Sequence, residues 1–364
     1  MQDSLDLRAL RDIGLSHATV QAALAQPRPE GTRLARVVEV QRDHLLVHDG
    51  DDAHAVVMWP MLRIVLEQER DQLVVGDWVW WRASASDGDR GWAVARLPAR
   101  NRLTRRDPAG GRQGLVANID VALLVMGLDH DFNLRRLDRF LVLAHSADAR
   151  VVVVLTKADE CADAAGALAR VRAHLGDARD DIAIVAVDGR SPEAVRALSP
   201  WLARGSTLVT LGSSGAGKTT LTNTLTGASS TTRAVREADE RGQHTTTVRT
   251  LRRTDGGACL IDTPGLRQLW LDADAETLGG AFPEIGTLAL QCRYRNCRHA
   301  REPGCAVREQ VAPERLVSFQ KLLREANRES EDVFQRRRHV AQMKRRARDM
   351  RGRDAMRGAG KGDA

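Results

Sequence analysis

Cysteine is scarce in this chain, and long apolar runs are missing. The 364 residues include five cysteines, and no segment approaches the ~18 consecutive apolar residues of a membrane-spanning helix. Residues 1–6 (MQDSLD) lack the basic and then apolar pattern of a secretory leader. An odd cysteine count without a leader argues against a disulfide framework. We therefore expect a cytoplasmic protein that does not contact a membrane.

Aromatic residues are also rare, but they are concentrated. They make up 4% of the chain, yet five of its seven tryptophans fall within residues 59–92. Residues 31–100 alternate apolar and polar side chains in short runs, which predicts a small antiparallel barrel. OB-fold barrels stack nucleic-acid bases on aromatic surfaces, although we favour core filling for most of these rings. Trp78 and Trp80 are expected on one strand face and Trp81 on the other.

The most specific motif is a phosphate loop at residues 212–219 (GSSGAGKT), which fits GxxxxGK[ST] at every fixed position. Its glycines let backbone N–H groups curl around phosphate oxygens, Lys218 reaches the terminal phosphates, and the Thr219 hydroxyl is a magnesium ligand. The flanking sequence predicts a buried strand before the loop and a helix after it. A glycine-rich turn without a ligand is the alternative. The predicted contacts are Gly212, Ser213, Ser214, Gly215, Ala216, Gly217, Lys218, Thr219 and Thr220.

A second phosphate-side element follows downstream. Residues 262–265 (DTPG) come after an apolar stretch, as expected for a DxxG switch at a strand end. Asp262 would hold magnesium through water, and the Gly265 N–H would sense the terminal phosphate. Between loop and switch, residues 242–247 (GQHTTT) are rich in hydroxyls. One of these threonines, with Thr246 as our candidate, would complete the magnesium shell of Thr219 and Asp262.

The base-reading element precedes the phosphate loop, the reverse of the usual GTPase order. Residues 156–159 (TKAD) fit the N/TKxD pattern and follow the continuous apolar strand 150–155. Nucleotides bind at the carboxyl ends of parallel strands, so this strand places the motif well. The inverted order predicts a circularly permuted GTPase.

The base contacts follow from this assignment. Asp159 can accept hydrogen bonds from guanine N1–H and the exocyclic amine, a pairing that adenine does not offer, and Lys157 would pack over the base. A helix cap is the alternative role for Asp159. A second strand at 182–186 should supply the loop that touches the base oxygen. The predicted base-side residues are Thr156, Lys157, Ala158, Asp159, Ala186 and Val187.

A metal site is predicted by the spacing Cys292-x4-Cys297-x-His299-x5-Cys305. Three thiolates and one imidazole make a closed tetrahedral site, which leaves no open position for chemistry. We therefore predict one structural Zn²⁺, with disulfides or free thiols as the alternative. The two remaining cysteines suit small buried hydrophobic positions.

Together these motifs resemble the ribosome small-subunit-dependent GTPase A family (RsgA type). The resemblance rests on the permuted order, the HTTT sequence from His244, the cysteine and histidine cluster with EPGC at 302–305, and ANID at 117–120, and it covers roughly residues 30–330. Departures are Thr156 for Asn, Gln243 for the commoner Arg, and a long basic tail. The family implies an OB-fold, a permuted α/β GTPase and a mainly helical zinc domain that act in late small-subunit maturation.

The resemblance also implies partners and cofactors. The expected partners are GTP or GDP and the small ribosomal subunit with its rRNA, whose binding would stimulate hydrolysis; Mg²⁺ would bind with GTP. Eleven lysines and arginines against three aspartates give residues 336–364 a formal charge of +8, above the +7 of the whole chain. Such arms attract phosphate backbones, so we favour contact with rRNA over a merely solvated tail. We expect a monomer.

The predicted domain layout has five parts. They are a loose leader with one short helix (1–30), the OB-fold (31–100), the GTPase (101–275), the zinc domain (276–335) and the basic tail (336–364).

The catalytic assignment depends on Leu266, which stands where many GTPases have a water-orienting glutamine. An aliphatic side chain does not hydrogen-bond water, so hydrolysis without a partner should be slow. His244 is the nearest candidate to position the attacking water, and a merely solvated histidine is the alternative. Lys218 and Thr219 complete the predicted catalytic set. Two other functions stay open: a P-loop phosphotransferase, and a non-catalytic zinc-containing RNA-binding protein.

Overall fold

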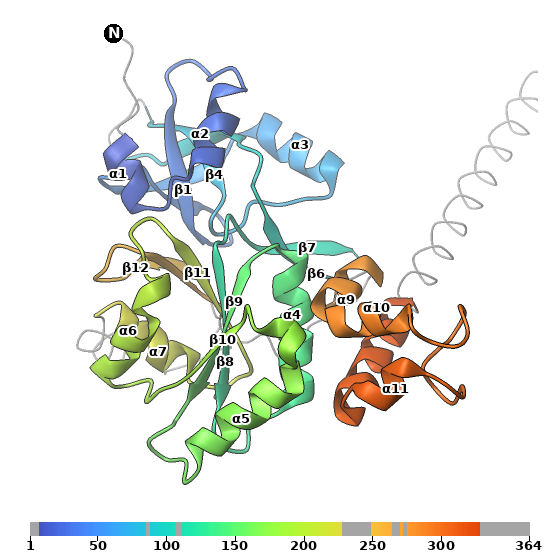
Figure 1. Ribbon diagram of the computed structural model, residues 1–364. Helices are drawn as coiled ribbons and strands as arrows, with labels where there is room; N and C mark the ends of the chain where they lie inside the picture. The colour runs from blue at the N-terminus through green and yellow to red at the C-terminus, as the bar shows by residue number, and fades with distance from the viewer. Residues whose placement is uncertain are drawn as a thin grey trace, which may run out of the picture.

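A computed structural model describes residues 7–84, 88–106, 111–227, 249–263, 270–271 and 275–327. These residues form a barrel at one end, a central sheet with helices on both faces, and a helical C-terminal part beside that sheet (Figure 1). No helix among them is long and apolar enough to cross a bilayer.

Five strands close into a barrel, because β1 pairs with both β2 and β4 in the order β1-β2-β3-β5-β4. The strands are β1 (Arg33–Val40), β2 (Leu45–His48), β3 (Ala53–Met58), β4 (Trp78–Arg82) and β5 (Gly91–Arg96). A closed barrel is confirmed, but it is not antiparallel throughout, since β3 and β5 pair in parallel. Helix α3 (Pro60–Glu69) and β4 lie between these two strands in sequence, and such a crossover permits parallel pairing.

The described region before the barrel, from residue 7 on, differs from the loose leader with one short helix that the sequence suggests. It contains two helices, α1 (Leu7–Asp12) and α2 (His17–Leu24). Leu10 and Ile13 are buried against the barrel in a cluster that includes Trp78 and Trp80. The apolar outer face of β4 therefore explains why this segment packs.

The tryptophans of the barrel divide as the alternation of β4 predicts. Trp78 and Trp80 face the cluster with the N-terminal helices, whereas Trp81 packs into the barrel core on the other face. All three rings are buried, so they fill the core. Trp59 and Trp92 are half-buried and meet edge to face, with ring centroids 5.2 Å apart.

The central sheet contains six strands in the order β10-β9-β8-β11-β13-β12. They are β8 (Val121–Gly127), β9 (Arg150–Thr156), β10 (Ala183–Ala186), β11 (Thr207–Leu211), β12 (Thr250–Arg253) and β13 (Cys259–Asp262). Five strands run parallel and β12 is antiparallel at one edge. Their near-continuous apolar sequences are typical of a parallel sheet buried on both faces. β12 also pairs with β1, which joins the sheet to the barrel.

Helices cover both faces of this sheet. On β8, Leu124 and Met126 pack on the side of α4 and α5, and Leu123 and Val125 on the side of α6 and α7. The helices are α4 (Leu134–Ser146), α5 (Ala164–Leu175), α6 (Pro192–Leu198) and α7 (Lys218–Leu225), with the short 3₁₀ turns η1 (Asp177–Arg179) and η2 (Ser199–Trp201). A small second sheet contains β6 (Arg102–Arg106), β7 (Arg112–Ala117) and β14 (Trp270–Leu271).

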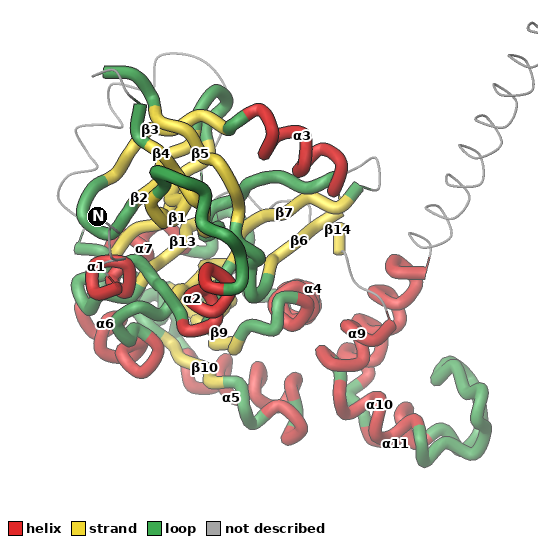
Figure 2. Tube along the Cα trace, turned by 90° about the horizontal axis from the view of Figure 1, so that it is seen from above, coloured by secondary structure: helices red, strands yellow, loops and turns green. Residues whose placement is uncertain are grey.

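The C-terminal part packs against α4 (Figure 2). It contains α9 (Ala275–Ala281), α10 (Pro283–Ala289), α11 (Ala306–Gln310) and residues 313–327, here called the C-terminal helix. Arg315 of this helix is buried and donates hydrogen bonds to Asp138 of α4, to Glu284 Oε1 at 2.8 Å and to Ala281 O at 3.1 Å. Removing one partner of a buried ion pair is strongly destabilising, so this network fixes the C-terminal part on the sheet domain.

Candidate nucleotide site and metal centre

The sheet order brings the two nucleotide motifs together despite their reversed order in the chain. β8 separates β9, which ends at Thr156, from β11, which leads into the phosphate loop. Thr156 is buried, and its Oγ1 donates to Ala216 O at 2.7 Å. Its small side chain also lies against Gly217, where an added Cβ would come within 3.1 Å of Thr156 Oγ1. The two motifs are thus in direct contact.

Glycine is required at different positions of the phosphate loop for different structural reasons. At Gly212 an added Cβ would lie 2.3 Å from Val125 O of β8, so the loop passes too close to its neighbour for a side chain. Gly215 and Gly217 both have φ of 86°, in the left-handed region that favours glycine. A Cβ at Gly215 would meet nothing within 4 Å. The loop is therefore tight against the sheet and open toward solvent at Gly215.

Lys218 begins α7, and its side chain folds back across the loop. Its Nζ donates to Gly212 O at 2.9 Å and to Ser213 O at 2.6 Å. The residue is 6% exposed, and this burial lowers the pKa of Lys218, against the opposing effects of the Asp262 and Asp131 carboxylates. The ammonium is therefore held inside the loop, where a phosphate would find it.

Hard oxygen ligands lie beside the lysine. Thr219 Oγ1 is 3.5 Å from Asp262 Oδ2, and Thr210 Oγ1 donates to Asp262 Oδ1 at 3.2 Å. A hydroxyl and a carboxylate this close together suit Mg²⁺, which takes few protein oxygens and keeps several waters. Asp262 ends β13, next to the phosphate-loop strand β11.

The base side of the site is a cavity of about 130 Å³. Five residues of the predicted motifs line it: Thr156, Lys157, Asp159, Gly217 and Thr220. Asp188, from the expected loop at the end of the second strand, lines it as well, with three residues that the motifs did not predict: Glu160, Gly189 and Arg190. The strand at 183–186 pointed to this region, but the side chains that follow it could be placed only by the fold.

Asp159 is engaged in an ion pair. Arg190 Nη2 donates to Asp159 Oδ2 at 2.7 Å and lies 3.3 Å from Glu160 Oε1, and Arg190 Nε donates to Asp188 Oδ1 at 3.3 Å. The carboxylates of Asp188 and Asp159 raise the pKa of Arg190. Asp159 does not cap the following helix, since Asp163 is the N-cap of α5. The Asp159 carboxylate thus lines the cavity, and one of its oxygens accepts the hydrogen bond from Arg190.

Lys157 lies along the rim between the two halves. It has a positive φ of 60°, and its Nζ donates to Asp129 Oδ2 at 2.6 Å and to Gly215 O at 2.9 Å. The hydrogen bond from Lys157 lowers the pKa of Asp129. The lysine therefore connects the base motif to the phosphate loop.

Three predicted residues form the backbone framework behind the cavity and do not line it. Ala158 N donates to Val187 O at 3.2 Å, and Val187 N donates to Leu155 O at 2.8 Å. Ala186 ends β10 beside Leu155. His244, Thr246 and Gly265, together with Leu266, lie outside the described residues.

The predicted metal ligands Cys292, Cys297, His299 and Cys305 come together, with all four ligand atoms within 4.8 Å of one another. His299 Nδ1 is 3.4 Å from Cys305 Sγ and 3.6 Å from Cys292 Sγ, and the two sulfurs are 3.9 Å apart. Bonds of about 2.3 Å for Zn–S and 2.0–2.1 Å for Zn–N give tetrahedral ligand separations of roughly 3.5–3.8 Å. The cysteines are not disulfide-bonded, so the donor set and its spacing fit zinc.

Glu302 organises the loop that carries these ligands. Its carboxylate accepts hydrogen bonds from the backbone N–H groups of Arg298, Ala300 and Arg301 at 2.8–3.0 Å. The backbone N–H of Glu302 itself, together with these N–H groups, lowers the pKa of Glu302 to about 2. The carboxylate therefore stays charged and holds His299 in position within the turn.

Comparisons with known proteins agree with this geometry. The family model for the RsgA GTPase matches residues 96–272. The small ribosomal subunit biogenesis GTPase RsgA of Xanthomonas campestris (strain B100) is 44% identical over 301 residues, which are 79% of each chain. The protein of the same name from Xylella fastidiosa (strain 9a5c) is 45% identical over 311 residues, 83% of this chain and 86% of the other.

The chain belongs to the RsgA GTPase family. Solved structures agree: YjeQ from Thermotoga maritima has a TM-score of 0.60 at 25% identity and covers 81% of this chain and 98% of its own. YloQ, described as a circularly permuted GTPase, has a TM-score of 0.55 at 22% identity and covers 82% and 96%. The permuted GTPase fold predicted from motif order is confirmed, and GTP hydrolysis is the activity of this RsgA family member.

Proposed function

We propose that this GTPase binds guanine nucleotide between the phosphate loop and residues 156–159, and acts with the small ribosomal subunit. The observation that carries the nucleotide assignment is the hydrogen bond from Thr156 Oγ1 to Ala216 O, which joins the base motif to the phosphate loop. The alternative of a phosphotransferase lacks comparable support, since the chain belongs to a GTPase family.

In the proposed complex, the Asp159 carboxylate accepts hydrogen bonds from guanine N1–H and the exocyclic amine. Arg190 releases the Asp159 oxygen to which it donates, so that this oxygen can bind the base. Backbone N–H groups of residues 212–219 surround the phosphates, and Lys218 exchanges its carbonyl partners for phosphate oxygens. Thr219 and Asp262 hold Mg²⁺, which neutralises developing phosphate charge when bound. Thr246 and Gly265 remain sequence-based candidates for the magnesium shell and the terminal phosphate.

Catalysis then depends on positioning water. Leu266 cannot hydrogen-bond it, so we propose His244 for this role, once the partner has ordered the surrounding loop. Slow hydrolysis in isolation, on the order of 10⁻⁴–10⁻² s⁻¹, is typical of GTPases that lack a complete catalytic set.

The remaining parts are proposed to recognise the subunit. The matched relatives are named for small ribosomal subunit biogenesis, and we infer the same process for this cytoplasmic, monomeric chain. The OB-fold at 31–100, the zinc domain at 276–335 and the basic tail at 336–364 would contact rRNA around the GTPase at 101–275. One structural Zn²⁺ on Cys292, Cys297, His299 and Cys305 would hold the zinc domain in shape.

Single-turnover GTP hydrolysis with and without purified small subunits tests this function. Strong stimulation of the wild type is expected, with much weaker stimulation of His244→Ala. Failure of subunits to stimulate the wild type would contradict the ribosomal role. Equal stimulation of His244→Ala would remove only the proposed role of that histidine.

A further inference from the structure

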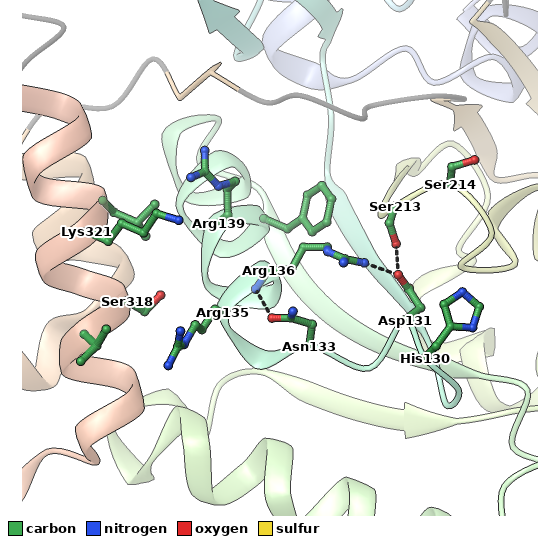
Figure 3. Close-up of a pocket in the computed structure, with 13 residues that line it drawn as sticks. His130, Asp131, Asn133, Arg135, Arg136, Arg139, Ser213, Ser214, Ser318 and Lys321 are labelled. Carbon is green, nitrogen blue, oxygen red and sulfur yellow. Dashed lines mark hydrogen bonds and ion pairs between the residues drawn. The ribbon is translucent and has the colours of Figure 1, made fainter.

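A large cleft lies next to the phosphate loop but outside the nucleotide cavity. Its volume is about 670 Å³, and its walls are residues 130–140, at the start of α4, and residues 317–322 of the C-terminal helix. Ser213 and Ser214 of the phosphate loop form one end (Figure 3). We call this space the α4 cleft. Neither nucleotide binding nor the zinc site explains it.

The lining of the α4 cleft is strongly basic. Arg135, Arg136 and Arg139 come from α4 and Lys321 from the opposite wall, whereas Asp131 is the one carboxylate among its lining residues (Figure 3). Arg136 pairs with Asp131, and Arg139 pairs with Glu325 at 2.6 Å. Across the described part of the chain, Arg135 and Lys321 have no carboxylate within ion-pair distance. The cleft therefore has an excess of positive charge.

The placement of these arginines on the helix adds a second, independent argument. α4 has thirteen residues, with Asn133 as its N-cap, and its first turn contains Arg135 and Arg136 but no acidic residue. The N-terminus of a helix carries a partial positive charge, so two cations there are unfavourable unless an anion lies in front of them. Asp131 supplies one such anion for Arg136. A bound anion beside Arg135 would complete the arrangement.

The walls of the cleft are fixed relative to each other. Buried Arg315 joins the C-terminal helix to Asp138 of α4, and the next residue of α4, Arg139, donates two hydrogen bonds to Glu325, at 2.9 and 2.6 Å. Asp138 also meets His174 Nε2 of α5 at 3.0 Å. A binding site between such walls is preorganised, which reduces the free energy lost on ordering when a ligand binds.

We propose that the α4 cleft binds the phosphate backbone of an RNA segment of the small ribosomal subunit. Unpaired arginine and lysine side chains, with the hydroxyl groups of Ser213, Ser214 and Ser318 nearby, are the groups that contact phosphate and sugar oxygens in nucleic acids. The inference rests on the proposed function, because it names the part of the partner that reaches the GTPase. An acidic protein segment would satisfy the charge alone and is an outcome of the test.

Occupation of the cleft is linked to the nucleotide site through Asp131. This buried carboxylate accepts hydrogen bonds from Arg136 in the cleft, from Ser213 Oγ in the phosphate loop and from Gly127 N at 3.2 Å. An RNA phosphate that attracts Arg136 weakens its hold on Asp131 and thereby alters the support of Ser213. By reciprocity, RNA binding and GTP binding then change each other's affinity by the same factor.

The test compares two double variants of the full chain with equal charge loss. Arg135→Ala with Lys321→Ala removes the unpaired cations of the cleft, and Arg196→Ala with Arg252→Ala removes two exposed arginines from α6 and β12. Binding to purified small subunits and to their protein-free rRNA is measured over a range of salt concentrations. Thermal unfolding and GDP affinity check that both variants are folded and bind nucleotide.

The cleft variant is expected to bind both probes about tenfold more weakly near 0.15 M salt, with a salt slope reduced by roughly 1.5–2. The control should stay within about twofold of the wild type. Equal loss in both variants would overturn the proposal, because total charge would then explain it. Loss of binding to subunits but not to protein-free rRNA would also overturn it, in favour of a ribosomal protein.

Nucleotide linkage supplies the final readout. GTP affinity of the wild type should change on addition of rRNA, and that change should disappear in the cleft variant. If rRNA changes the GTP affinity of the cleft variant as much as that of the wild type, the proposed coupling through Asp131 is contradicted. If subunits fail to stimulate wild-type hydrolysis, the proposed function falls, whereas rRNA binding by the two variants still decides the cleft.

Discussion

The two halves of the nucleotide site are built differently. The phosphate half contains a buried cation and is held by backbone geometry: Lys218 is 6% exposed, and Gly212 passes so close to Val125 O that no side chain fits. The base half is open and held by charges, since the side chains of Arg190 and Asp159 are 62% and 33% exposed. Contacts among exposed charges are weak and easily exchanged. We therefore propose that the phosphate half supplies affinity and the base half supplies selectivity.

This division has a physical reason. Phosphate is common to all nucleotides, so a rigid cradle of N–H groups and one buried cation serves any of them. A base must be distinguished by hydrogen bonds that its competitor cannot make, and the loss of such bonds leaves partners unmatched. In the proposed complex Asp159 would exchange Arg190 for guanine, and the exposure of this ion pair makes it easy to break.

The largest expected effect comes from the buried half. Lys218→Ala should lower the rate of GTP hydrolysis by about 10²–10³-fold, because it removes a preorganised cation at the transferring phosphate. The measurement is single-turnover hydrolysis at saturating GTP. A loss below tenfold would mean that the lysine is not placed on the terminal phosphates.

The next effect belongs to the base half. Asp159→Asn should weaken GDP binding roughly ten- to a hundredfold, since a charge-assisted pair is worth ~1.5–3 kcal/mol, while ADP binding stays nearly constant. Competition titrations with both nucleotides provide the measurement. Unchanged GDP affinity would contradict the base-reading assignment.

A smaller effect of opposite sign is expected at Arg190. Arg190→Ala should strengthen GDP binding about two- to fivefold, because Asp159 no longer has to release an exposed ion-pair partner before it meets the base. The gain should shrink at high salt, which screens the pair in the wild type. Weaker GDP binding would show that Arg190 supports the base instead of competing with it.

A substitution in the metal centre should leave nucleotide affinity unchanged. Cys297→Ser should lower the zinc content below one per chain and lower the unfolding temperature of the C-terminal part, because structural zinc supplies folding free energy. GDP affinity should stay within about twofold of the wild type. Metal analysis and GDP titration of the same preparation provide the check, and absence of zinc from the wild type would contradict the site.

The sequence is most informative where function depends on local spacing, and the four predicted metal ligands do come together. The phosphate loop and the four metal ligands lie within short segments, so their chemistry follows from residue type and separation. It also predicted the permuted fold, because parallel strands place their carboxyl ends at one edge whatever their order in the chain.

It failed where the fold brings distant charges together. Nothing in the sequence pairs Arg190 with Asp159, or links Asp131 to both Ser213 and Arg136, because these contacts depend on how the loops after β8 and β10 turn. The contacts of Lys157 Nζ with Asp129 and Gly215 O were likewise not predicted from the motif, and its place over the base stays a prediction. The parallel β3–β5 pair and the packed N-terminal helices depend likewise on tertiary contacts that short-range alternation does not encode.

The most direct test of the division is the ratio of the Kd for ADP to the Kd for GDP, measured side by side in wild type, Lys218→Ala and Asp159→Asn. We expect a large ratio in the wild type, a similar ratio in Lys218→Ala despite weaker binding of both nucleotides, and a ratio that falls toward one in Asp159→Asn. A wild-type ratio near one, or an equal fall of the ratio in Lys218→Ala, would contradict the separation of affinity from selectivity.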